Sequence, residues 1–229
     1  MINEECLICK APLRYLSTDE EMECVFCHKK KYSKTKCEKG HFVCDECHTS
    51  GMNGIASICL NSKCDDPIEI LEIMMNMPFC HMHGPEHHTM VGSALLTAYK
   101  NAGGEIDLKS ALDEMRNRGK QVPGGSCGFW GACGAGISAG IFVAIVSRST
   151  PLSTEAWGLS NQMTAKALNA IGKNGGPRCC KRDSYLAIVE AVKFTREHLR
   201  INMQLSPIIC TRSHLNNQCR QGKCPFYKG

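Results

Sequence analysis

The sequence lacks the features that would place it in several common protein classes. Its first residues, MINEECLICK, have neither a basic start nor an apolar core, so we expect no export signal. No phosphate loop, dinucleotide-binding fingerprint or nucleophile elbow is visible, because the glycines do not follow a strand pattern. The net charge is only +5, which by itself indicates no strong affinity for nucleic acid. These absences disfavour secreted, nucleotide-binding and serine-hydrolase classes.

Cysteine and histidine are abundant instead. The chain holds 17 Cys and 9 His, a content typical of either a disulfide framework or bound metal. A disulfide framework requires an oxidising compartment, and it is disfavoured by the odd number of cysteines and by their close CxxC pairs. We therefore predict a metal-binding protein of the reducing cytoplasm.

Composition divides the chain into three parts. Residues 1–66 are rich in cysteine, residues 67–204 have helical periodicity, and residues 205–229 form a tail with three more cysteines and no acidic residue. The predicted fold class is mainly α. It consists of a bundle of about six helices and a small N-terminal module of the zinc-ribbon or treble-clef kind.

The N-terminal module carries its candidate metal ligands in pairs or near-pairs. These residues are Cys6, Cys9, Cys24, Cys27, Cys37, His41, Cys44, Cys47, Cys59 and Cys64. A CxxC loop presents two thiolates to one ion, and zinc takes four ligands in a tetrahedron, so two loops complete a site. Zinc is the expected ion, and its expected role is to hold together a module with few large apolar side chains.

Two ways of sharing the ligands remain open. A zinc ribbon would use Cys6, Cys9, Cys24 and Cys27 for one ion and draw the second site from the remaining ligands. An interleaved cross-brace, which resembles RING-type and related treble-clef fingers, would use Cys24, Cys27, Cys44 and Cys47 for one ion and Cys37, His41, Cys59 and Cys64 for the other. The cross-brace leaves Cys6 and Cys9 unused. The basic run HKKKYSKTK is expected to be a solvated loop, because acidic residues outnumber basic ones in the module.

Periodicity and capping residues predict the helices of the central part. Their apolar stripes, rich in Met and Ala, are expected to form the core. The expected caps or first residues are Pro67, Pro85, Asp107, Ser126, Ser153 and Asp183.

The stretch from Val122 to Ser147 has no charged residue and is long enough to cross a bilayer. It also contains Gly136 and Gly140 in a GxxxG arrangement, which occurs in packed membrane helices. However, its first half is Gly-rich and contains two cysteines, and the flanking helices are amphipathic. We therefore predict a buried central helix, whose glycines let neighbouring helices approach closely, rather than a membrane span.

Three polar motifs lie at expected helix N-termini, where backbone N–H groups favour anions and lower the pKa of thiols. Lys181 and Arg182 are expected to lower the thiol pKa further. The motifs are HMHGPEHH with His83, Glu86, His87 and His88, the pair Cys127 and Cys133, and GGPRCCKRD with Arg178, Cys179 and Cys180.

We expect these motifs to form one functional site. Cys127, Cys133 and one of Cys179 and Cys180 would give three ligands to an iron–sulfur cluster, whose last position stays open or takes His88. A mononuclear zinc or iron site is the alternative, with Glu86 as a base or as a partner of a histidine. In either site we expect His83, His87 and His88 to complete the coordination or move protons. Arg178, Lys181 and Arg182 would hold an anionic substrate or raise the potential of the cluster. The simplest alternative is buried thiols packed as small apolar side chains.

The motifs HGPEHH, CGFWGACGAGISAG and GGPRCCKRD together resemble a cysteine-rich family of unknown function from anaerobic bacteria and archaea, which has an N-terminal CxxC module. The resemblance covers nearly the whole chain. More distantly, PGGSCGFWGACGA followed by GPRCC is similar to the helical redox-active family named for its C-GCAxxG-C-C pattern. In that family an early cysteine stands where this chain has His87 or His88. The resemblance implies the cysteine-based redox or metal chemistry of an anaerobe.

The tail supplies three further candidate metal ligands, Cys210, Cys219 and Cys224. Proline directly after Cys224 is similar to the last ligand of bacterial ferredoxin motifs. Cys80 or His214 could supply a fourth ligand, and the alternative is a loose basic tail.

The sequence therefore favours a cytoplasmic metalloprotein with structural zinc sites and a redox or iron–sulfur site in a helical domain. Redox, sulfur or one-carbon chemistry on a small molecule, or with a redox-protein partner, fits these residues. The alternative is a non-enzymatic zinc-finger adaptor that binds a protein or RNA, and nucleic acid is the less expected of these partners.

Overall fold

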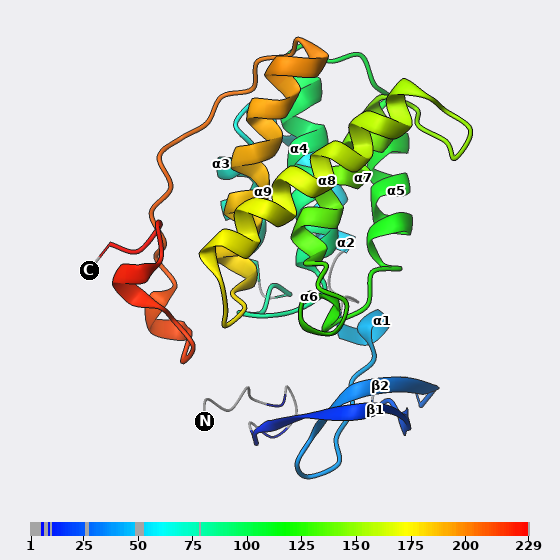
Figure 1. The fold of residues 1–229 in the computed structure, drawn as a ribbon, viewed down its shortest axis with the longest axis vertical. Coiled ribbons are helices and arrows are strands. Elements are labelled where there is room, and N and C mark those ends of the chain that lie inside the picture. The colour runs from blue at the N-terminus through cyan, green and yellow to red at the C-terminus, as the bar shows by residue number, and fades with distance from the viewer. Residues whose placement is uncertain are drawn as a thin grey trace. The chain divides into compact units, whose positions relative to one another are not determined.

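The computed structural model describes residues 6, 9, 11–25, 28–48, 53–77 and 79–228. Contacts divide the chain into two compact units, Met1–Ser50 and Gly51–Gly229 (Figure 1). The division lies before the boundary at residue 66 that composition indicates. The reason is that the segment containing Cys59 packs with the helical core.

The N-terminal unit is built on a β-hairpin. Strand β1 (Leu13–Glu23) pairs antiparallel with β2 (Lys30–Cys37), and the short helix α1 (Asp45–His48) follows. The basic run HKKKYSKTK was expected to be a loop, but most of it is β2. Its lysines face acidic side chains of β1: Lys30 pairs with Glu21 at 3.2 Å, and Lys36 pairs with Glu20. Cross-strand ion pairs of this kind support strand pairing, and chain composition alone does not reveal the partner.

The apolar core of the N-terminal unit is small. Among the described residues, the buried cluster consists of Phe42, Cys24 and Cys44, with Met22 and Cys47 packed against it. So few apolar side chains bury too little surface to hold a domain of this size. An additional source of stability is therefore required.

The second unit is mainly helical, as the sequence predicts. Its helices are α2 (Asn53–Asn61), α3 (Pro67–Met75), α4 (His87–Asn101), α5 (Leu108–Gly119), α6 (Ser126–Phe129), α7 (Gly134–Val146), α8 (Glu155–Asn174) and α9 (Cys180–Phe194). The predicted apolar faces of α3 and α4 are buried in a single large core.

The caps of these helices confirm some predictions and correct others. Asp107 accepts hydrogen bonds from the backbone N–H groups of Lys109 and Ser110, as a cap does. Helix α8 begins after Thr154 rather than at Ser153. Helix α9 begins at Cys180, which places Asp183 inside the first turn instead of at the cap.

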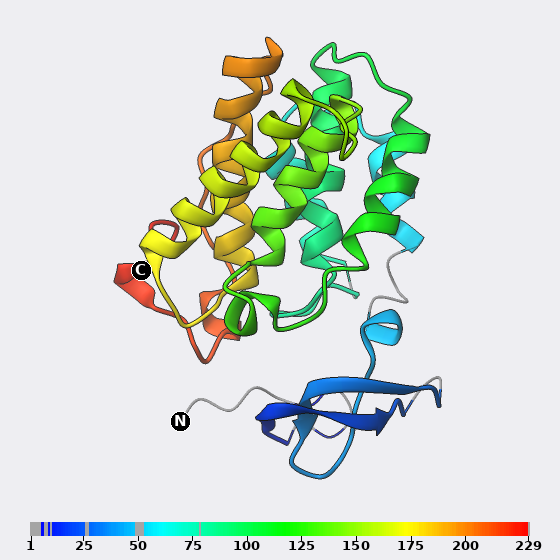
Figure 2. The ribbon, with the colours of Figure 1, turned by 45° about the vertical axis from the view of Figure 1, so that its right-hand side comes forward.

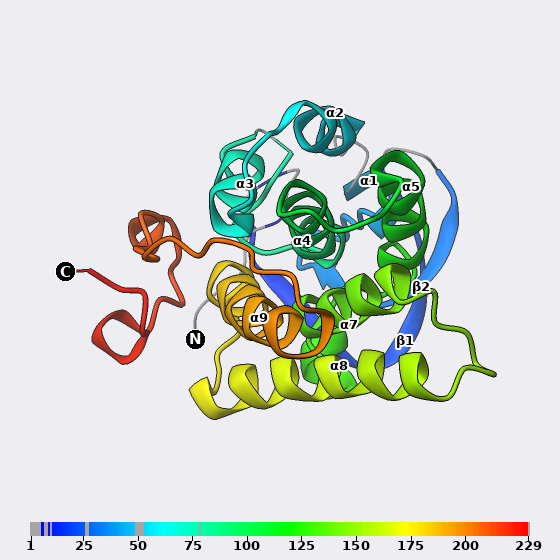
Figure 3. The same cartoon turned by 90° about the horizontal axis from the view of Figure 1, so that it is seen from above.

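Helix α7 lies at the centre of the bundle, in contact with α4, α5, α8 and α9 (Figure 3). Gly136 and Gly140 face α8. A Cβ atom added at Gly140 would lie 1.8 Å from Thr164 Oγ1, and one added at Gly136 would lie 2.7 Å from Leu168 Cδ2. The glycines thus permit close helix contact, as predicted. The charge-free stretch is also shorter as a helix than expected, because Gly131, with φ of +65°, separates α6 from α7.

Within the described part of the chain, no helix is long and apolar enough to cross a membrane.

The tail turns back beside the N-terminal end of α9 (Figure 2). Arg212 fixes it there: its Nη1 donates to Glu72 Oε2 at 2.8 Å and its Nη2 donates to Asn76 Oδ1 at 2.5 Å. Tyr185 of α9 also donates to Glu72. The tail is therefore ordered against α3 and α9 rather than loose.

Candidate functional site

One group of candidate metal ligands lies where the hairpin strands begin and end. Cys6 and Cys9 precede β1, Cys37 ends β2, and pairing of Leu13 with Cys37 brings these segments together. Cys9 Sγ lies 3.5 Å from Cys37 Sγ and 3.3 Å from His41 Nδ1, and Cys6 Sγ lies 3.9 Å from His41 Nδ1. All four ligand atoms lie within 4.8 Å of one another, which suits a single ion.

A second group lies at the other end of the hairpin. Cys24 follows β1, while Cys44 and Cys47 lie just before and within α1. The backbone N–H of Cys44 donates to Cys24 Sγ at 3.4 Å, and the three sulfur atoms lie within 4.8 Å of one another. The remaining candidate of this group, Cys27, lies outside the described residues.

The two groups interleave along the chain. The second group agrees with the cross-brace prediction, which gave Cys24, Cys44 and Cys47 to one ion, whereas the first group differs from both arrangements. Cys6 and Cys9 join Cys37 and His41, in the place where the cross-brace prediction put Cys59 and Cys64. Cys59 instead lies in α2, fully buried, and its thiol donates to Ser93 O at 3.8 Å. Cys64 contacts Glu69 Oε2 at 3.3 Å just before α3 begins. Both cysteines pack with the helical core.

The first group also stabilises a thiolate. Burial raises the pKa of Cys37, but hydrogen bonds from the backbone N–H of Lys39 and from Cys9 and His41 lower it more. The resulting pKa is about 7, against an ordinary value of 9.0. A thiolate available near neutral pH is the form that binds metal.

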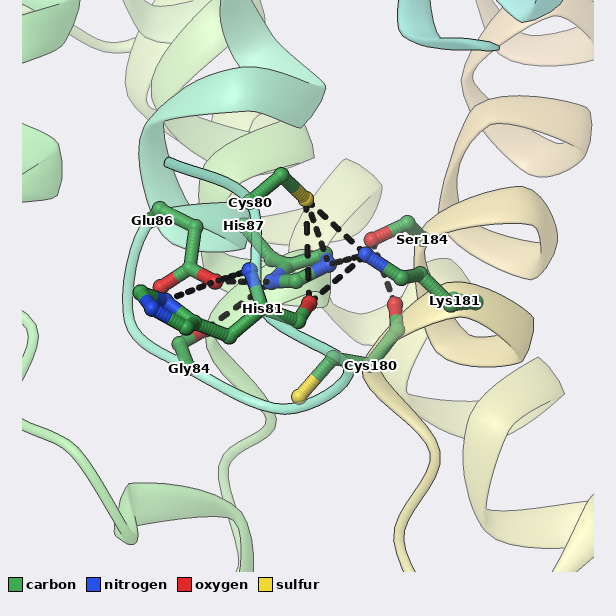
Figure 4. A network of polar contacts seen from close by, with 8 residues as sticks. All are labelled: Cys80, His81, Gly84, Glu86, His87, Cys180, Lys181 and Ser184. Carbon is green, nitrogen blue, oxygen red and sulfur yellow. Dashed lines mark hydrogen bonds and ion pairs between the residues drawn. The ribbon is translucent and has the colours of Figure 1, made fainter. Parts of the chain in front are cut away.

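The helical unit contains a buried polar cluster centred on Lys181, which is only 2% exposed (Figure 4). Its Nζ lies 2.9 Å from Cys80 Sγ, 2.8 Å from His81 O and 3.0 Å from His87 Nε2. An ammonium group has three N–H donors, so these three acceptors satisfy it completely. The cluster joins the loop before α4 to the first turn of α9.

The protonation of His87 follows from its contacts. Its Nδ1 lies 3.0 Å from Gly84 O, so Nδ1 carries the proton and Nε2 accepts from Lys181. Burial, and then the positive charge of Lys181, lower the pKa of His87 to about 3. Glu86 is fully buried next to it, with Oε1 accepting a hydrogen bond from the backbone N–H of His81 at 2.9 Å.

Cys80, Glu86 and His87 also have ligand atoms within 4.8 Å of one another. However, the Lys181 ammonium already bonds to both Cys80 Sγ and His87 Nε2. A metal ion at that place would sit against a second cation, which is unfavourable where water is excluded. The geometry therefore fits a proton-holding cluster better than a metal site.

Three of the cysteines predicted as ligands lie near one another. The thiol of Cys133 donates to Asp183 Oδ2 at 3.9 Å, and Cys127 lies close enough to interact electrostatically with both. Cys180 interacts with Cys133 and accepts a hydrogen bond from the backbone of Gly84. Among the described residues, these cysteines do not belong to any group whose ligand atoms lie within 4.8 Å of one another.

The pKa values of these cysteine thiols are shifted in the direction opposite to the prediction. We expected helix N-termini and Lys181 to lower their pKa values. Burial instead raises the pKa of Cys127, Cys179 and Cys180, and it raises the pKa of Cys133 to about 12 with a further contribution from Asp183. Loss of water outweighs the helix dipole here, and the Lys181 ammonium points to Cys80 instead.

The adjacent cysteines 179 and 180 have different neighbours. Cys180 interacts with Cys133, whereas the Cys179 sulfur accepts a hydrogen bond from Asn216 Nδ2 in the tail at 3.6 Å. Arg178 interacts electrostatically with Cys127 and Cys180 and lowers the pKa of both thiols, although burial outweighs it. Of these two cysteines, Cys180 is therefore the one that interacts with the cysteines of the bundle, and Cys179 contacts the tail.

The remaining predicted histidines make specific contacts. His88 Nδ1 donates to Val122 O at 2.9 Å, and its ring packs on Gly134, where an added Cβ would lie 2.2 Å from the ring. His83 Nε2 lies 3.3 Å from Asn216 Oδ1 in the tail.

Sequence reasoning missed two members of the site. Cys80 was considered only for the tail, and Lys181 only as a group that acts on its neighbouring cysteines. The sequence offered no signal for Lys181, because the expected cap at Asp183 put this residue before the helix, whereas α9 begins at Cys180 and places the ammonium-bearing residue in the first turn.

A comparison with models of protein families identifies the family of this chain. A family model described as "Family of unknown function (DUF5714)" matches residues 55–227. The chain belongs to this family. The match covers the helical unit and its polar motifs and begins after the N-terminal metal ligands. No curated protein and no solved structure gives a significant match to the chain.

Proposed function

We propose that the chain is a cytoplasmic metalloprotein in which the N-terminal unit binds structural zinc and the helical unit carries out cysteine-dependent redox chemistry. The observation that carries the redox part is the approach of Cys127, Cys133 and Cys180, from three separate segments, beside a buried acid–base cluster. Redox, sulfur or one-carbon chemistry with a small molecule or a redox-protein partner is compatible with these groups.

Zinc in the N-terminal unit is supported by ligand spacing. Tetrahedral ligands at about 2.3 Å from an ion lie roughly 3.8 Å apart. The measured separations of 3.3 to 3.9 Å among Cys6, Cys9, Cys37 and His41 are close to that value. The small apolar core of the unit gives the ions a structural role.

In the helical unit, three cysteines would hold an iron–sulfur cluster and leave one iron open to substrate. Such a cluster supplies electron transfer or an electrophilic iron. Among the described residues, these three cysteines do not form a group whose sulfur atoms all lie within 4.8 Å of one another, and a cluster accepts a wider separation of its ligands than a single ion does. Arg178 provides positive charge next to Cys127 and Cys180. The Lys181 ammonium and the neutral His87 hold a proton between Nζ and Nε2, 3.0 Å apart.

The test is anaerobic purification of the intact chain and of the Cys127→Ala, Cys133→Ala double variant, with an optical spectrum and iron, sulfide and zinc analysis. We expect the double variant to lose the iron, sulfide and visible absorption that belong to the bundle cluster while it keeps its zinc. Cys64→Ser removes a thiol elsewhere in the helical unit and should change none of these quantities.

Zinc alone in the intact chain, unaffected by the double substitution, would overturn the redox proposal. It would favour the adaptor alternative, in which the same cysteines are packed thiols and the substitutions only lower stability. Far-ultraviolet circular dichroism of each variant separates loss of a cluster from loss of fold.

A further inference from the structure

Four cysteines from two distant segments line one hollow between α9 and the tail. Cys179 comes from the N-terminal end of α9, and Cys210, Cys219 and Cys224 come from the tail. The hollow encloses about 400 Å³, counting the part open to solvent. Cys80 and His214, which the sequence offered as the fourth ligand, are not among the residues that line this hollow.

The tail cysteines are held in place by contacts of their own. The backbone N–H of Cys210 donates to Phe226 O at 2.7 Å, which closes the tail into a loop, and Cys210 forms a β-bridge with Tyr227. Arg212 anchors this loop to α3 through Glu72. Hydrogen bonds therefore hold the tail residues that line the hollow in place.

Two of the sulfur atoms receive hydrogen bonds. Asn216 Nδ2 donates to Cys179 Sγ at 3.6 Å, and the backbone N–H of Gln221 donates to Cys219 Sγ at 3.4 Å. Asn216 is itself only 5% exposed. Hydrogen bonds to cysteine sulfur are one of the ways in which proteins set the potential of iron–sulfur clusters.

The charge of the hollow also suits an anionic centre. Arg182, Arg212 and Arg220 all line it and no acidic residue does, although Arg182 is ion-paired with Asp183 and Arg212 with Glu72. A cluster bound by four thiolates carries net negative charge, which neighbouring guanidinium groups offset.

We propose that Cys179, Cys210, Cys219 and Cys224 bind one iron–sulfur cluster. A single tetrahedral ion would need these sulfur atoms roughly 3.8 Å apart. Among the described residues, they do not form a group whose ligand atoms lie within 4.8 Å of one another. A cluster places irons and sulfides between its cysteines and so takes them at wider separation. Proline follows Cys224, as it follows the last cysteine of bacterial ferredoxin motifs.

The tail cluster would transfer electrons within the proposed redox function. If the bundle cysteines also bind a cluster, the adjacent residues Cys179 and Cys180 belong to two different centres joined by one peptide bond. The tail cluster would then exchange electrons between the bundle site and a redox partner. This role rests on the proposed function, whereas the binding of the tail cluster does not.

The experiment is anaerobic reconstitution with ferrous iron and sulfide, followed by iron and sulfide analysis and electron paramagnetic resonance after reduction. Cys219→Ser with Cys224→Ser should remove one cluster, which means a loss of about two or about four irons per chain. Ser213→Ala alters the lining of the same hollow without removing a thiol and should keep full iron content.

Asn216→Ala provides a second, milder test. Removing the hydrogen bond to Cys179 should shift the reduction potential or resonance of one centre while iron content stays constant. A merely structural asparagine would leave both signals unchanged.

Unchanged iron in the Cys219→Ser, Cys224→Ser variant, together with an unchanged resonance in Asn216→Ala, would overturn the inference. Loss of zinc rather than iron from the tail variant would do the same. If iron survives Cys127→Ala with Cys133→Ala but disappears with the tail variant, the tail cluster stands and the redox proposal for the bundle fails.

Discussion

At the scale of the residue, the most informative side chain is Lys181. A buried ammonium is costly unless every N–H donor is bonded, and here Cys80, His81 and His87 supply the acceptors. The neutral state of His87 is what lets its Nε2 accept. Each of these three contacts spans more than 90 positions of the chain, so no local pattern encodes them.

Replacing this lysine tests the network. Lys181→Met keeps most of the side-chain volume but leaves buried acceptors without a donor, so the free energy of unfolding should fall by about 1–3 kcal/mol. Lys120→Met, at an exposed position, should change it by less than about 0.5 kcal/mol. Urea unfolding followed by circular dichroism measures both. Equal stability of the two variants would contradict the assigned hydrogen bonds.

At the scale of the element, helix α7 explains why the chain tolerates so much glycine in a central helix. Glycine lowers helix stability by about 1 kcal/mol relative to alanine. Gly136 and Gly140 have no side chain, which allows α8 to contact α7 closely. Gly134 leaves room for the ring of His88 in the same way. Close helix packing therefore offsets the intrinsic cost.

A matched pair of substitutions separates the effect of helix packing on stability from the effect of helix propensity. Gly140→Ala should destabilise the protein by about 1–3 kcal/mol, because the new methyl group would collide with Thr164 and approach Ser160 O to 3.1 Å. Gly158→Ala lies in α8 with open space around it, so it should stabilise by up to about 1 kcal/mol. Thermal unfolding would reveal the opposite signs. A stabilising Gly140→Ala would mean that α7 and α8 are farther apart.

At the scale of the whole molecule, the two units rely on different sources of stability. The helical unit has a large apolar core, whereas the described residues of the N-terminal unit bury little besides Phe42 and its cysteines. Metal binding to an otherwise weak core couples ligand occupancy directly to folding. The response of the two units to metal removal should therefore differ.

A chelator should unfold the N-terminal unit and leave most of the helical signal intact. In hydrogen exchange, the amides of β1 and β2 should lose protection while those of α4 and α7 keep it. Cys37→Ser should lower the zinc content by about one ion per chain. Cys64→Ser should not, because this cysteine lies apart from the ligand groups. Loss of protection throughout the helices would argue against independent units.

The sequence by itself determined the helical class, the cap at Asp107, the buried faces of α3 and α4 and the glycine contacts of α7. These features depend on neighbours within a few positions or on helical periodicity. The basic run forms β2 only through pairing with β1, and its own composition does not reveal that partner.

Only the tertiary structure decided which ligands share a site. Antiparallel pairing of the hairpin brings Cys6 and Cys9 to Cys37, and Cys59 in α2 packs into the helical core. The return of the tail gives Cys179 different neighbours from Cys180. Spacing along the chain fixes a local pair of ligands, but the choice of the second pair depends on contacts between segments that are distant in sequence.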